Sequence, residues 1–213
     1  MNGRYVPANV YWFRGLGPGK GFAKREVLFE GGSDNDHAMA TANTADLDGD
    51  GDLDLLVGDV KGRAWLVRNA GTKQAPKFVE REPLLVGKEH VRVNQKSDVI
   101  AADWDGDGKL DLLVGDEVGD VSFFAGKGDG TFEAGLSLFT KQPVDATLGY
   151  QKAKKNLEPH RVIPGYRLRL AVADWNDDGK LDLLVGNCET KPKPGGGEDE
   201  TITIGNVYVL LRE

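Results

Sequence analysis

One short run of apolar residues, LDLLVG, occurs three times in the chain, at residues 53–58, 110–115 and 181–186. In the first copy, Leu55 and Val57 would point to one side of an extended strand and Leu56 to the other. A strand that is apolar on both faces suits burial between two layers, whereas a half-exposed strand would alternate apolar and polar residues. The run is too short for a buried helix and ends on glycine, so we predict a buried β-strand in each copy.

Each predicted strand belongs to a longer unit with the same order of strands. A first strand is predicted before it, at residues 37–45, 98–102 and 168–173. A third strand follows a short turn, at residues 63–68, 120–125 and 206–211. A fourth strand is predicted after a glycine-containing turn, at residues 79–86 and 132–138. A unit of about four antiparallel strands in about 60 residues has the size of one blade of a β-propeller, so we predict an all-β fold of this type.

The two ends of the sequence match inner parts of the same unit. NVYWFR at residues 9–14 is similar to AWLVR at residues 64–68, so the chain is expected to open in a third strand. We predict a single partial β-propeller over residues 1–213, with about three four-stranded antiparallel blades. Its expected parts are strands 3–4 of a blade at 5–32, a blade at 33–95, a blade with an inserted loop at 96–166, and strands 1–3 of a last blade at 167–213. Propellers close with about four to eight blades. We therefore expect either a truncated reading frame, which we favour, or the assembly of several copies.

Each first strand is predicted to lead into an acidic loop. The loops are DLDGDGDLD at residues 46–54, DWDGDGKLD at 103–111 and DWNDDGKLD at 174–182. Oxygen-bearing side chains stand at loop positions 1, 3, 5 and 9, and glycine stands at position 6. Ca²⁺ binds about six to eight oxygen atoms, and glycine allows the sharp turn that wraps a loop around the ion. The sequence therefore predicts about three Ca²⁺ ions, each in a loop between strands 1 and 2 of a blade.

Other calcium motifs do not fit these loops. An EF-hand requires a bidentate glutamate at position 12 and a helix on each side. Position 12 is occupied here by Val57, Val114 and Val185. The nonapeptide β-helix pattern and the paired cysteines of disulfide-rich modules are both absent from the sequence. A solvated acidic turn that binds nothing stays the alternative for any single loop, most of all for the third, which carries Asn176 and Asp177.

The acidity of the chain is concentrated in these loops. The net charge is −7, and eleven of the carboxylates are proposed ligands, so the remaining residues carry +4 together. No acidic surface for a basic partner is therefore predicted. Cys188 is the one cysteine, which excludes an intrachain disulfide. The sequence has no run of 18 apolar residues and no signal-peptide pattern after Met1. Loops of this class would be largely empty at cytosolic calcium levels, so we expect an extracellular, periplasmic or cell-surface location.

The segments DLDGDGDLDLLVGD and DWDGDGKLDLLVGD resemble the FG-GAP or VCBS repeats of integrin-α-like β-propellers, and the resemblance spans nearly the whole chain. In that family the loop joins strands 1 and 2 of a blade and binds calcium, mostly as a structural brace. The resemblance implies three sets of side-chain ligands: Asp46, Asp48, Asp50 and Asp54; Asp103, Asp105, Asp107 and Asp111; and Asp174, Asn176, Asp178 and Asp182. It also implies that position 7 contributes a main-chain carbonyl, from Asp52, Lys109 and Lys180. The chain departs from the family pattern at Asn176, at Asp177 in place of glycine, and in lacking a clear Phe-Gly–Gly-Ala-Pro element.

Two inserted loops and two residue types carry the remaining predictions. Residues 142–166 form an insertion with KAKK at 152–155 and a short helix; it either contacts a ligand or, as we favour, is a solvated connection. Residues 191–200 are expected to form a flexible, exposed loop within the third hairpin. The histidines, at positions 37, 90 and 160, have unrelated offsets and predict no metal or catalytic cluster. Trp12 and Trp65 occupy equivalent positions and are predicted to be packing residues, with stacking on sugars as the alternative.

The sequence favours a binding module over an enzyme. We interpret the chain as a calcium-binding β-propeller repeat module, the ligand-binding or adhesion scaffold of an exported protein, with a protein or carbohydrate ligand. The alternative is the C-terminal part of a propeller enzyme that acts on carbohydrate as a lyase or dehydratase; a purely structural repeat is a third interpretation. No GxSxG, P-loop or HExxH pattern occurs, and no catalytic residue is predicted. Neither a nucleic-acid partner nor a membrane span is predicted.

Overall fold

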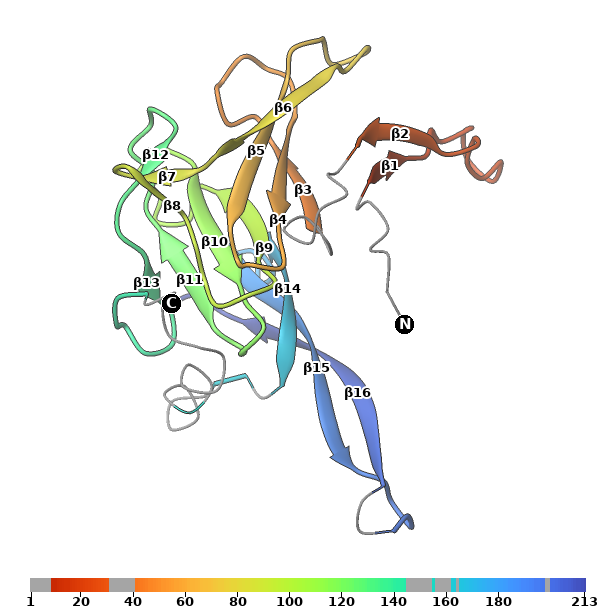
Figure 1. Ribbon diagram of the computed structural model, residues 1–213, viewed down its shortest axis with the longest axis vertical. Coiled ribbons are helices and arrows are strands. Elements are labelled where there is room, and N and C mark those ends of the chain that lie inside the picture. The colour runs from red at the N-terminus through yellow and green to blue at the C-terminus, as the bar shows by residue number, and fades with distance from the viewer. Residues whose placement is uncertain (1–8, 31–40, 145–154, 156–161, 164, 198–199) are drawn as a thin grey trace, which may run out of the picture.

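The computed structural model is an all-β molecule, and it describes residues 9–30, 41–144, 155, 162–163, 165–197 and 200–213 (Figure 1). The first sheet contains, in spatial order, β3 (Thr41–Ala45), β4 (Asp54–Gly58), β5 (Ala64–Asn69) and β6 (Phe78–Pro83). The second sheet contains β9 (Asp98–Ala102), β10 (Asp111–Gly115), β11 (Val121–Phe124) and β13 (Leu136–Ser137). The third sheet contains β14 (Tyr166–Ala173), β15 (Asp182–Pro192) and β16 (Thr201–Leu210). All the strand pairs in these three sheets are antiparallel, as predicted.

Two smaller sheets complete the described fold. One is the pair β1 (Val10–Trp12) and β2 (Glu26–Phe29), which lies beside the first sheet at one end of the molecule (Figure 1). The other contains β12 (Thr131–Phe132), β7 (Leu85–Val86) and β8 (Glu89–His90). In this sheet, β12 pairs in parallel with β7. The pairing joins a segment that follows the second larger sheet's β11 to a segment that follows the first larger sheet's β6. No described sheet closes into a barrel or ring.

The LDLLVG runs form the centre of the three larger sheets. In the first sheet, Leu56 of β4 lies opposite Asn43 of β3 and Leu66 of β5. Leu55 and Val57 point to the other side, where they pack with Val10, Leu28 and Phe29 of the β1–β2 pair. Both faces of the strand are covered, and every residue of β4 and of β10 is buried. The prediction of strands buried on both faces is thus confirmed for these two copies.

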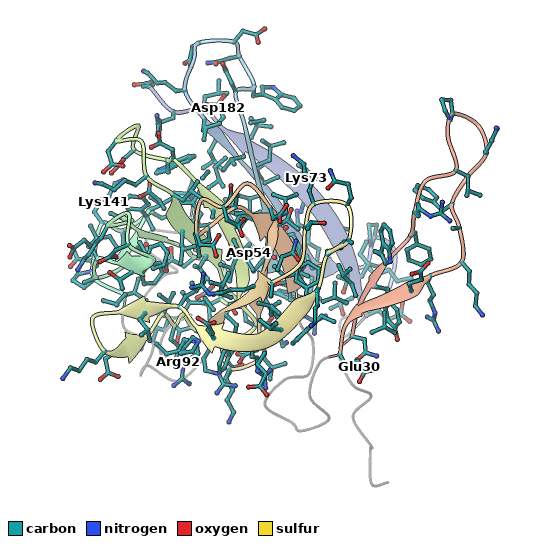
Figure 2. The ribbon with its side chains drawn as sticks, turned by 90° about the horizontal axis from the view of Figure 1, so that it is seen from above. Glu30, Asp54, Lys73, Arg92, Lys141 and Asp182 are labelled. Atoms are coloured by element: carbon teal, nitrogen blue, oxygen red, sulfur yellow. The ribbon has the colours of Figure 1, made fainter. Side chains whose placement is uncertain are left out.

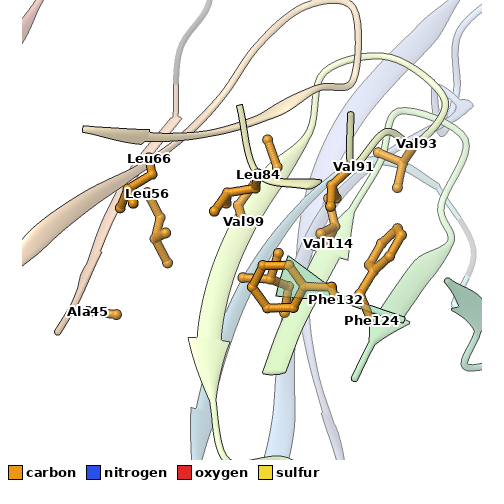
Figure 3. Close-up of a cluster of buried hydrophobic side chains, with 12 residues drawn as sticks. Ala45, Leu56, Leu66, Leu84, Val91, Val93, Val99, Val114, Phe124 and Phe132 are labelled. Atoms are coloured by element: carbon orange, nitrogen blue, oxygen red, sulfur yellow. The ribbon is translucent and has the colours of Figure 1, made fainter. Parts of the chain in front are cut away.

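The core lies in layers between successive sheets. Figure 3 shows the largest layer, where Leu56 and Leu66 of the first sheet meet Val99, Val114 and Phe124 of the second. A second layer lies between the second and third sheets and has Ile100 and Leu113 on one side, with Leu170, Leu183 and Val185 on the other. A full set of such contacts buries most of each side chain. Each Å² of apolar surface removed from water stabilises the folded state by about 25 cal/mol. The three sheets are therefore held together by apolar layers that repeat with the sequence.

The first strands of the three sheets, β3, β9 and β14, lie side by side. The carboxylate of Asp98 on β9 joins all three strands, because it accepts hydrogen bonds from Asn43 Nδ2 at 3.2 Å and from the backbone N–H of Leu170 at 2.8 Å. Thr41 Oγ1 adds a bond to the carbonyl of Ser97 at 3.0 Å. These bonds are buried or half-buried, so they fix the lateral spacing of neighbouring sheets.

The predicted fourth strands differ from the structure. The first, expected at 79–86, is split into β6 and β7, because Leu84 turns into the core and Pro83 offers no N–H to continue the ladder. The second, expected at 132–138, is reduced to β13, and Phe132 lies instead in β12. Phe132 is almost fully buried in the layer of Figure 3. The long-range burial of this ring therefore overrides the local strand order.

The remaining predicted elements agree in part. The first strand of the first unit begins at Thr41, and residues 37–40 lie outside the described residues. The third hairpin is longer than expected, since β15 and β16 run to Pro192 and from Thr201, and it extends away from the other sheets in Figure 1. The turn at 193–197 is exposed. The helix expected in the insertion at 142–166 falls mostly on undescribed residues. Within the described ranges, no helix is long and apolar enough to cross a membrane.

Candidate metal loops

The three acidic loops join the first and second strands of each sheet, and their first aspartate organises them. Asp46 accepts hydrogen bonds from the N–H groups of Gly49 at 2.8 Å and Gly51 at 3.0 Å. Asp103 receives the same pair of bonds from Gly106 and Gly108, at 2.9 and 3.1 Å. In the third loop, Asp174 bonds the N–H groups of Asp178 and Gly179, at 3.0 and 2.9 Å. In each loop, the first carboxylate therefore holds the loop backbone in a compact turn by accepting two backbone N–H groups.

The backbone of the loops requires left-handed residues at positions 4 and 6. Gly49 and Gly51 have φ of 76° and 93°, and the second loop repeats these values closely with glycine at both positions. In the third loop, position 4 is Asp177, with φ of 59°. Aspartate is among the few side chains that tolerate this conformation. The third loop therefore keeps the fold of the others despite its different sequence.

The ninth residue of each loop is a buried aspartate that begins the second strand, and Figure 2 labels Asp54 and Asp182. Its Oδ1 accepts the N–H at the end of the third strand, from Asn69, Gly126 and Arg212 respectively, at 2.8 Å in each case. In the second and third loops, Oδ2 accepts the N–H of the tryptophan at loop position 2, at 2.8 and 2.9 Å. The residue thus ties the loop to two strands. The sequence analysis did not predict this role, although the unchanged aspartate at position 9 was a signal for it.

Asp54 differs from its two counterparts. Its Oδ2 atom is buried and has no hydrogen-bond partner. Burial raises the pKa of Asp54, and the nearby charge of Asp48 adds to this; the backbone N–H groups of Asn69 and Leu47 and the charge of Arg68 lower it, but the net shift is upward. A buried carboxylate oxygen without a donor is unstable unless a positive charge or a proton meets it. A cation near Asp54 would therefore lower the cost of its buried charge.

The carboxylates converge in the first two loops. Oxygen atoms of Asp46, Asp48 and Asp50 all lie within 4.8 Å of one another, and the same holds for Asp103, Asp105 and Asp111. Asp54 lies outside the first group and Asp107 outside the second. These are the two groups of acidic, histidine or cysteine side chains with metal-binding spacing in the described residues. Such clusters of hard oxygen atoms suit Ca²⁺ or Mg²⁺ rather than softer metals.

Several predicted ligands, including Asp48 of the first group, have other partners in this structure. Asp48 bonds Arg68 Nη1 at 2.7 Å, and Asp107 bonds Lys109 Nζ at 2.6 Å. In the third loop, Asn176 Nδ2 donates to Asp178 Oδ2 at 3.0 Å. At position 7, the backbone N–H of Asp52 and Lys109, like that of Lys180 in the third loop, bonds the aspartate two residues before it. Whether their carbonyl groups bind metal stays a prediction.

Further aspartates, which the sequence analysis passed over, stand at the opposite end of the sheets. Asp59 and Asp116 directly follow the LLVG runs, and both are buried. Asp59 bonds the N–H groups of Lys61 and Arg63, the Arg63 side chain at 2.6 Å, and Trp65 Nε1 at 2.9 Å. The carboxylate of Asp116 bonds three successive backbone N–H groups, of residues 118–120. The signal was available, because the repeat extends by one residue to LLVGD, LLVGD and LLVGN.

Trp65 is a packing residue, as predicted. Its ring lies against the layer beneath the β1–β2 pair, and the guanidinium carbons of Arg63 and Arg81 lie 4.9 and 4.8 Å from its centroid. The His90 ring lies edge-on to the Trp65 ring, with 4.4 Å between the two ring centroids. Burial lowers the pKa of this histidine. Cations and an imidazole thus occupy the surroundings of the ring, which argues against sugar stacking at this position. The histidines at positions 37 and 160 lie outside the described residues.

The sheets and loops define an all-β repeat protein with acidic loops, and comparison with known proteins gives the family. The model of the FG-GAP-like repeat matches residues 46–114 and 103–185. These matches cover more than half of the sequence, so the chain belongs to the FG-GAP-like repeat family. No curated protein sequence matches the chain.

A similar solved structure is that of an Agrocybe aegerita lectin, described as recognising non-reducing terminal N-acetylglucosamine. It is 19% identical to this chain, with a TM-score of 0.43, and the match covers 95% of this chain and 52% of the lectin. The chain therefore spans about half the length of this lectin.

Proposed function

We propose that the chain is a calcium-binding module of β-propeller type, in which each larger sheet is a blade and Ca²⁺ braces the loop between its first two strands. Membership of the FG-GAP-like family and the stacked antiparallel sheets support the propeller architecture. On this proposal the β1–β2 pair contributes strands 3 and 4 of a further blade. The ions have a structural role, and the blades form a rigid scaffold for binding.

The observation that carries the proposal is the cluster of carboxylates in the first loop, next to the buried Asp54. Three carboxylates lie within 4.8 Å of one another there, and the buried Oδ2 of Asp54 has no donor. Carboxylates at this spacing repel one another. A hydrogen bond to one carboxylate does not remove the repulsion between the other carboxylates. A divalent cation neutralises two negative charges and accepts several oxygen ligands at once. The residues present therefore fit a hard cation.

We assign the ions to the residues that the family pattern indicates. Asp46, Asp48, Asp50 and Asp54, with the carbonyl of Asp52, would hold the first ion. The second would have the corresponding residues 103–111. In the third loop, Asn176 replaces a carboxylate and the described residues form no acidic group of metal-binding spacing, so we assign it the weakest affinity. Because loops of this class fill at extracellular calcium levels, the proposal also places the protein outside the cytoplasm.

The proposed binding role rests on the loops at the other end of the blades. Long connections on a rigid scaffold are the usual place for ligand contacts. β14 begins at that end, where the Leu168 N–H donates to the carbonyl of Asp116, and the turns that hold Asp59 and Asp116 lie there too. We propose a protein or carbohydrate ligand there, in the manner of an adhesion module.

Terbium luminescence tests the metal sites one by one. Tb³⁺ takes the place of Ca²⁺ and emits when a nearby tryptophan is excited. Trp104 and Trp175 stand at position 2 of the second and third loops, whereas the first loop has Leu47. The backbone N–H of Trp104 donates a hydrogen bond to Oδ2 of Asp111, a proposed ligand, at 2.8 Å. We expect Trp104→Phe to remove the tighter sensitised phase and Trp175→Phe the weaker phase.

Two controls make this result specific. Trp12→Phe, far from the loops on β1, should leave both phases unchanged. Excess Ca²⁺ should displace the terbium signal, and Asp103→Asn should weaken the tighter phase without removing Trp104. Sensitised emission that persists in both Trp104→Phe and Trp175→Phe would contradict the assignment of metal to these loops.

A further inference from the structure

Arg68 connects the first acidic loop to the outer strands of its sheet. It stands on β5, and its Nη1 atom donates to Asp48 Oδ2 at 2.7 Å. Its Nε atom also lies 3.2 and 3.3 Å from the two carboxylate oxygens of Glu82 on β6. The three side chains are between 34% and 50% exposed, so they can exchange partners without unfolding the sheet. One guanidinium thus holds two carboxylates, and one of these belongs to a proposed metal ligand.

The sheet itself places Arg68 beside the loop. The ladder between β5 and β6 is irregular between Val67 and Asn69, with one additional residue on β6. An irregularity of this kind bends the strand pair and re-aims the side chains next to it. The N–H of Asn69 donates to Oδ1 of Asp54, the ninth loop residue, at 2.8 Å. Arg68 is therefore fixed one residue away from the point where the loop and β5 meet.

The other two loops have no arginine at this place. Counting from the residue whose N–H bonds the ninth aspartate, the position of Arg68 is taken by Ala125 in the second unit and Leu211 in the third. The second loop carries a cation of its own, Lys109, but it bonds a carboxylate outside the clustered group. Asp48, in contrast, is a member of the first group. The first loop thus differs from the second in having a clustered carboxylate paired with a cation from another strand.

The charge of Arg68 acts on the whole group of carboxylates. Burial raises the pKa of Asp54 and the charge of Asp48 adds to this, whereas the charge of Arg68 is among the influences that lower it. A cation reduces the repulsion between neighbouring carboxylates whether it is a metal ion or a guanidinium. A metal ion that enters the same group is repelled by the guanidinium and meets an Asp48 oxygen that already has a partner. The two cations therefore compete for the same negative charge.

We propose that Arg68 is a built-in competitor of the metal ion in the first loop: it holds Asp48 when no ion is bound and stays with Glu82 alone when the ion binds. The inference rests on the proposed function, because it requires that the first loop binds a metal. Arg68 gives this loop a lower affinity than the second loop and supports its fold without metal. Glu82 is the acceptor that keeps the released guanidinium away from the ion.

The test uses a reporter for the first loop alone. Leu47→Trp gives this loop the residue that the other two have at position 2, and Trp104→Phe with Trp175→Phe removes the reporters of those loops. We call the full chain with these three substitutions the reporter chain. Sensitised terbium emission then measures metal binding at the first loop, and titration with Ca²⁺ measures the competition. A salt concentration of about 0.15 M largely screens distant charges.

Two variants of the reporter chain should change the affinity in opposite directions. Arg68→Ala should tighten terbium binding by about fivefold, because a positive charge beside the ion is removed. Glu82→Gln should weaken it by about twofold, because the guanidinium then has one charged acceptor left, Asp48. The double variant should bind as Arg68→Ala does, since Glu82 acts through Arg68. Lys77→Ala removes an exposed cation directly before β6 and is the matched control, with an unchanged affinity.

Thermal stability gives a second readout, measured without the reporter substitutions. In excess chelator, Arg68→Ala should melt about 2 °C below the wild type, because the clustered carboxylates lose their counter-charge. In saturating calcium the difference should become smaller, because the ion then supplies that charge. An arginine with a purely structural role would lower both melts equally and would not tighten metal binding.

The outcomes separate this inference from the proposed function. A chain with neither sensitised emission at the first loop nor a calcium-dependent melt refutes the metal site and the competition together. Terbium binding that is unchanged or weakened by Arg68→Ala refutes the competition and leaves the metal site in place. An equal gain in affinity from Lys77→Ala would show that only the net charge of the sheet matters, which overturns the specific role of Arg68.

Discussion

The two ends of the sheets use the same residue, aspartate, in opposite ways. At the loop end, Asp46, Asp48 and Asp50 crowd their charges together near the surface. At the turn end, Asp59 and Asp116 are buried, and each is surrounded by backbone or side-chain donors. Several N–H groups can satisfy one isolated carboxylate, but they cannot offset the repulsion within a group of three. The comparison separates an end whose clustered carboxylates could hold a cation from an end whose carboxylates have hydrogen-bond donors of the protein itself.

The turn end is itself uneven. Asp59 has the guanidinium of Arg63 at 2.6 Å, so its charge is paired. Asp116 has only neutral donors, and burial raises its pKa well above the ordinary value. Asp120, close by, is half-buried, and burial raises its pKa to about 6 despite hydrogen bonds from Ser137 and Val121. The second sheet therefore holds acids whose charge is costly at neutral pH.

Removing metal should have the largest effect, and only through the loop end. A ligand at 100-fold excess over its Kd stabilises the folded state by about 2.7 kcal/mol per site. For the first two loops this sums to about 5 kcal/mol, or a fall in Tm of about 10 °C or more for a chain of this size. Thermal unfolding followed by circular dichroism, in calcium and in excess chelator, measures the difference. Asp103→Asn should remove about half of it, and an identical melt in both conditions would refute the bracing role.

Removing the Asp59 carboxylate should lower the stability of the turn end without changing metal binding by the loops. Asp59→Ala removes the acceptor that four buried or half-buried donors share, including the charged Arg63 side chain. We expect a loss of about 3 kcal/mol in the free energy of unfolding, measured by urea denaturation. Asp59→Asn keeps an acceptor for the two backbone N–H groups and should cost less; Asn187 stands at this position in the third unit. Terbium affinity of the loops should not change in either variant, and a weakened terbium signal would show that the two ends are coupled.

Asp120 should make stability depend on pH. Its pKa is raised in the folded state, so between pH about 4 and 6 the folded chain binds more protons than the unfolded chain. The free energy of unfolding contributed by this group is therefore highest at low pH and falls as pH rises through about 6. We expect Asp120→Asn to reduce that fall by about 2 kcal/mol, measured as the difference from wild type at each pH in equal calcium. Glu133→Gln, an exposed change of the same charge, is the control, and an equal effect there would contradict the assignment.

The smallest expected effect distinguishes the third loop from the other two. Asn176→Asp restores the fourth carboxylate and should tighten metal binding at that loop by about tenfold, since more negative ligands raise calcium affinity. The change removes the present bond from Asn176 Nδ2 to Asp178. Terbium emission sensitised by Trp175 reports the third loop, and the phase sensitised by Trp104 serves as the internal reference. An unchanged Trp175 phase would indicate that charge number does not set the rank of the loops.

Much of the fold follows from local pattern. The apolar LDLLVG runs, the strands that flank them and the glycines of the loops are set by residues close together in the sequence, and β4 and β10 are buried on both faces as that pattern predicts. The left-handed conformation of Asp177 was predictable for the same reason, from its alignment with glycine. The predicted fourth strands were less accurate, because Leu84 and Phe132 leave the ladder to fill a layer between two sheets. No local pattern reveals which distant sheet a side chain will meet.

The candidate site divides along the same line. The sequence by itself determined the three loops and their oxygen-bearing residues, and from these it predicts a hard cation, because loop spacing is a local property. Only the tertiary structure decided that Asp54, Asp111 and Asp182 also hold the end of the third strand, and that Asp98 bonds two neighbouring sheets. It alone shows that Leu56 and Leu113 are fully buried between sheets, whereas Val207 of β16 is exposed. Hydrogen bonds and apolar layers join segments that are far apart in the sequence. They depend on which of these segments become neighbours in the fold, and the identity of a single residue does not determine that.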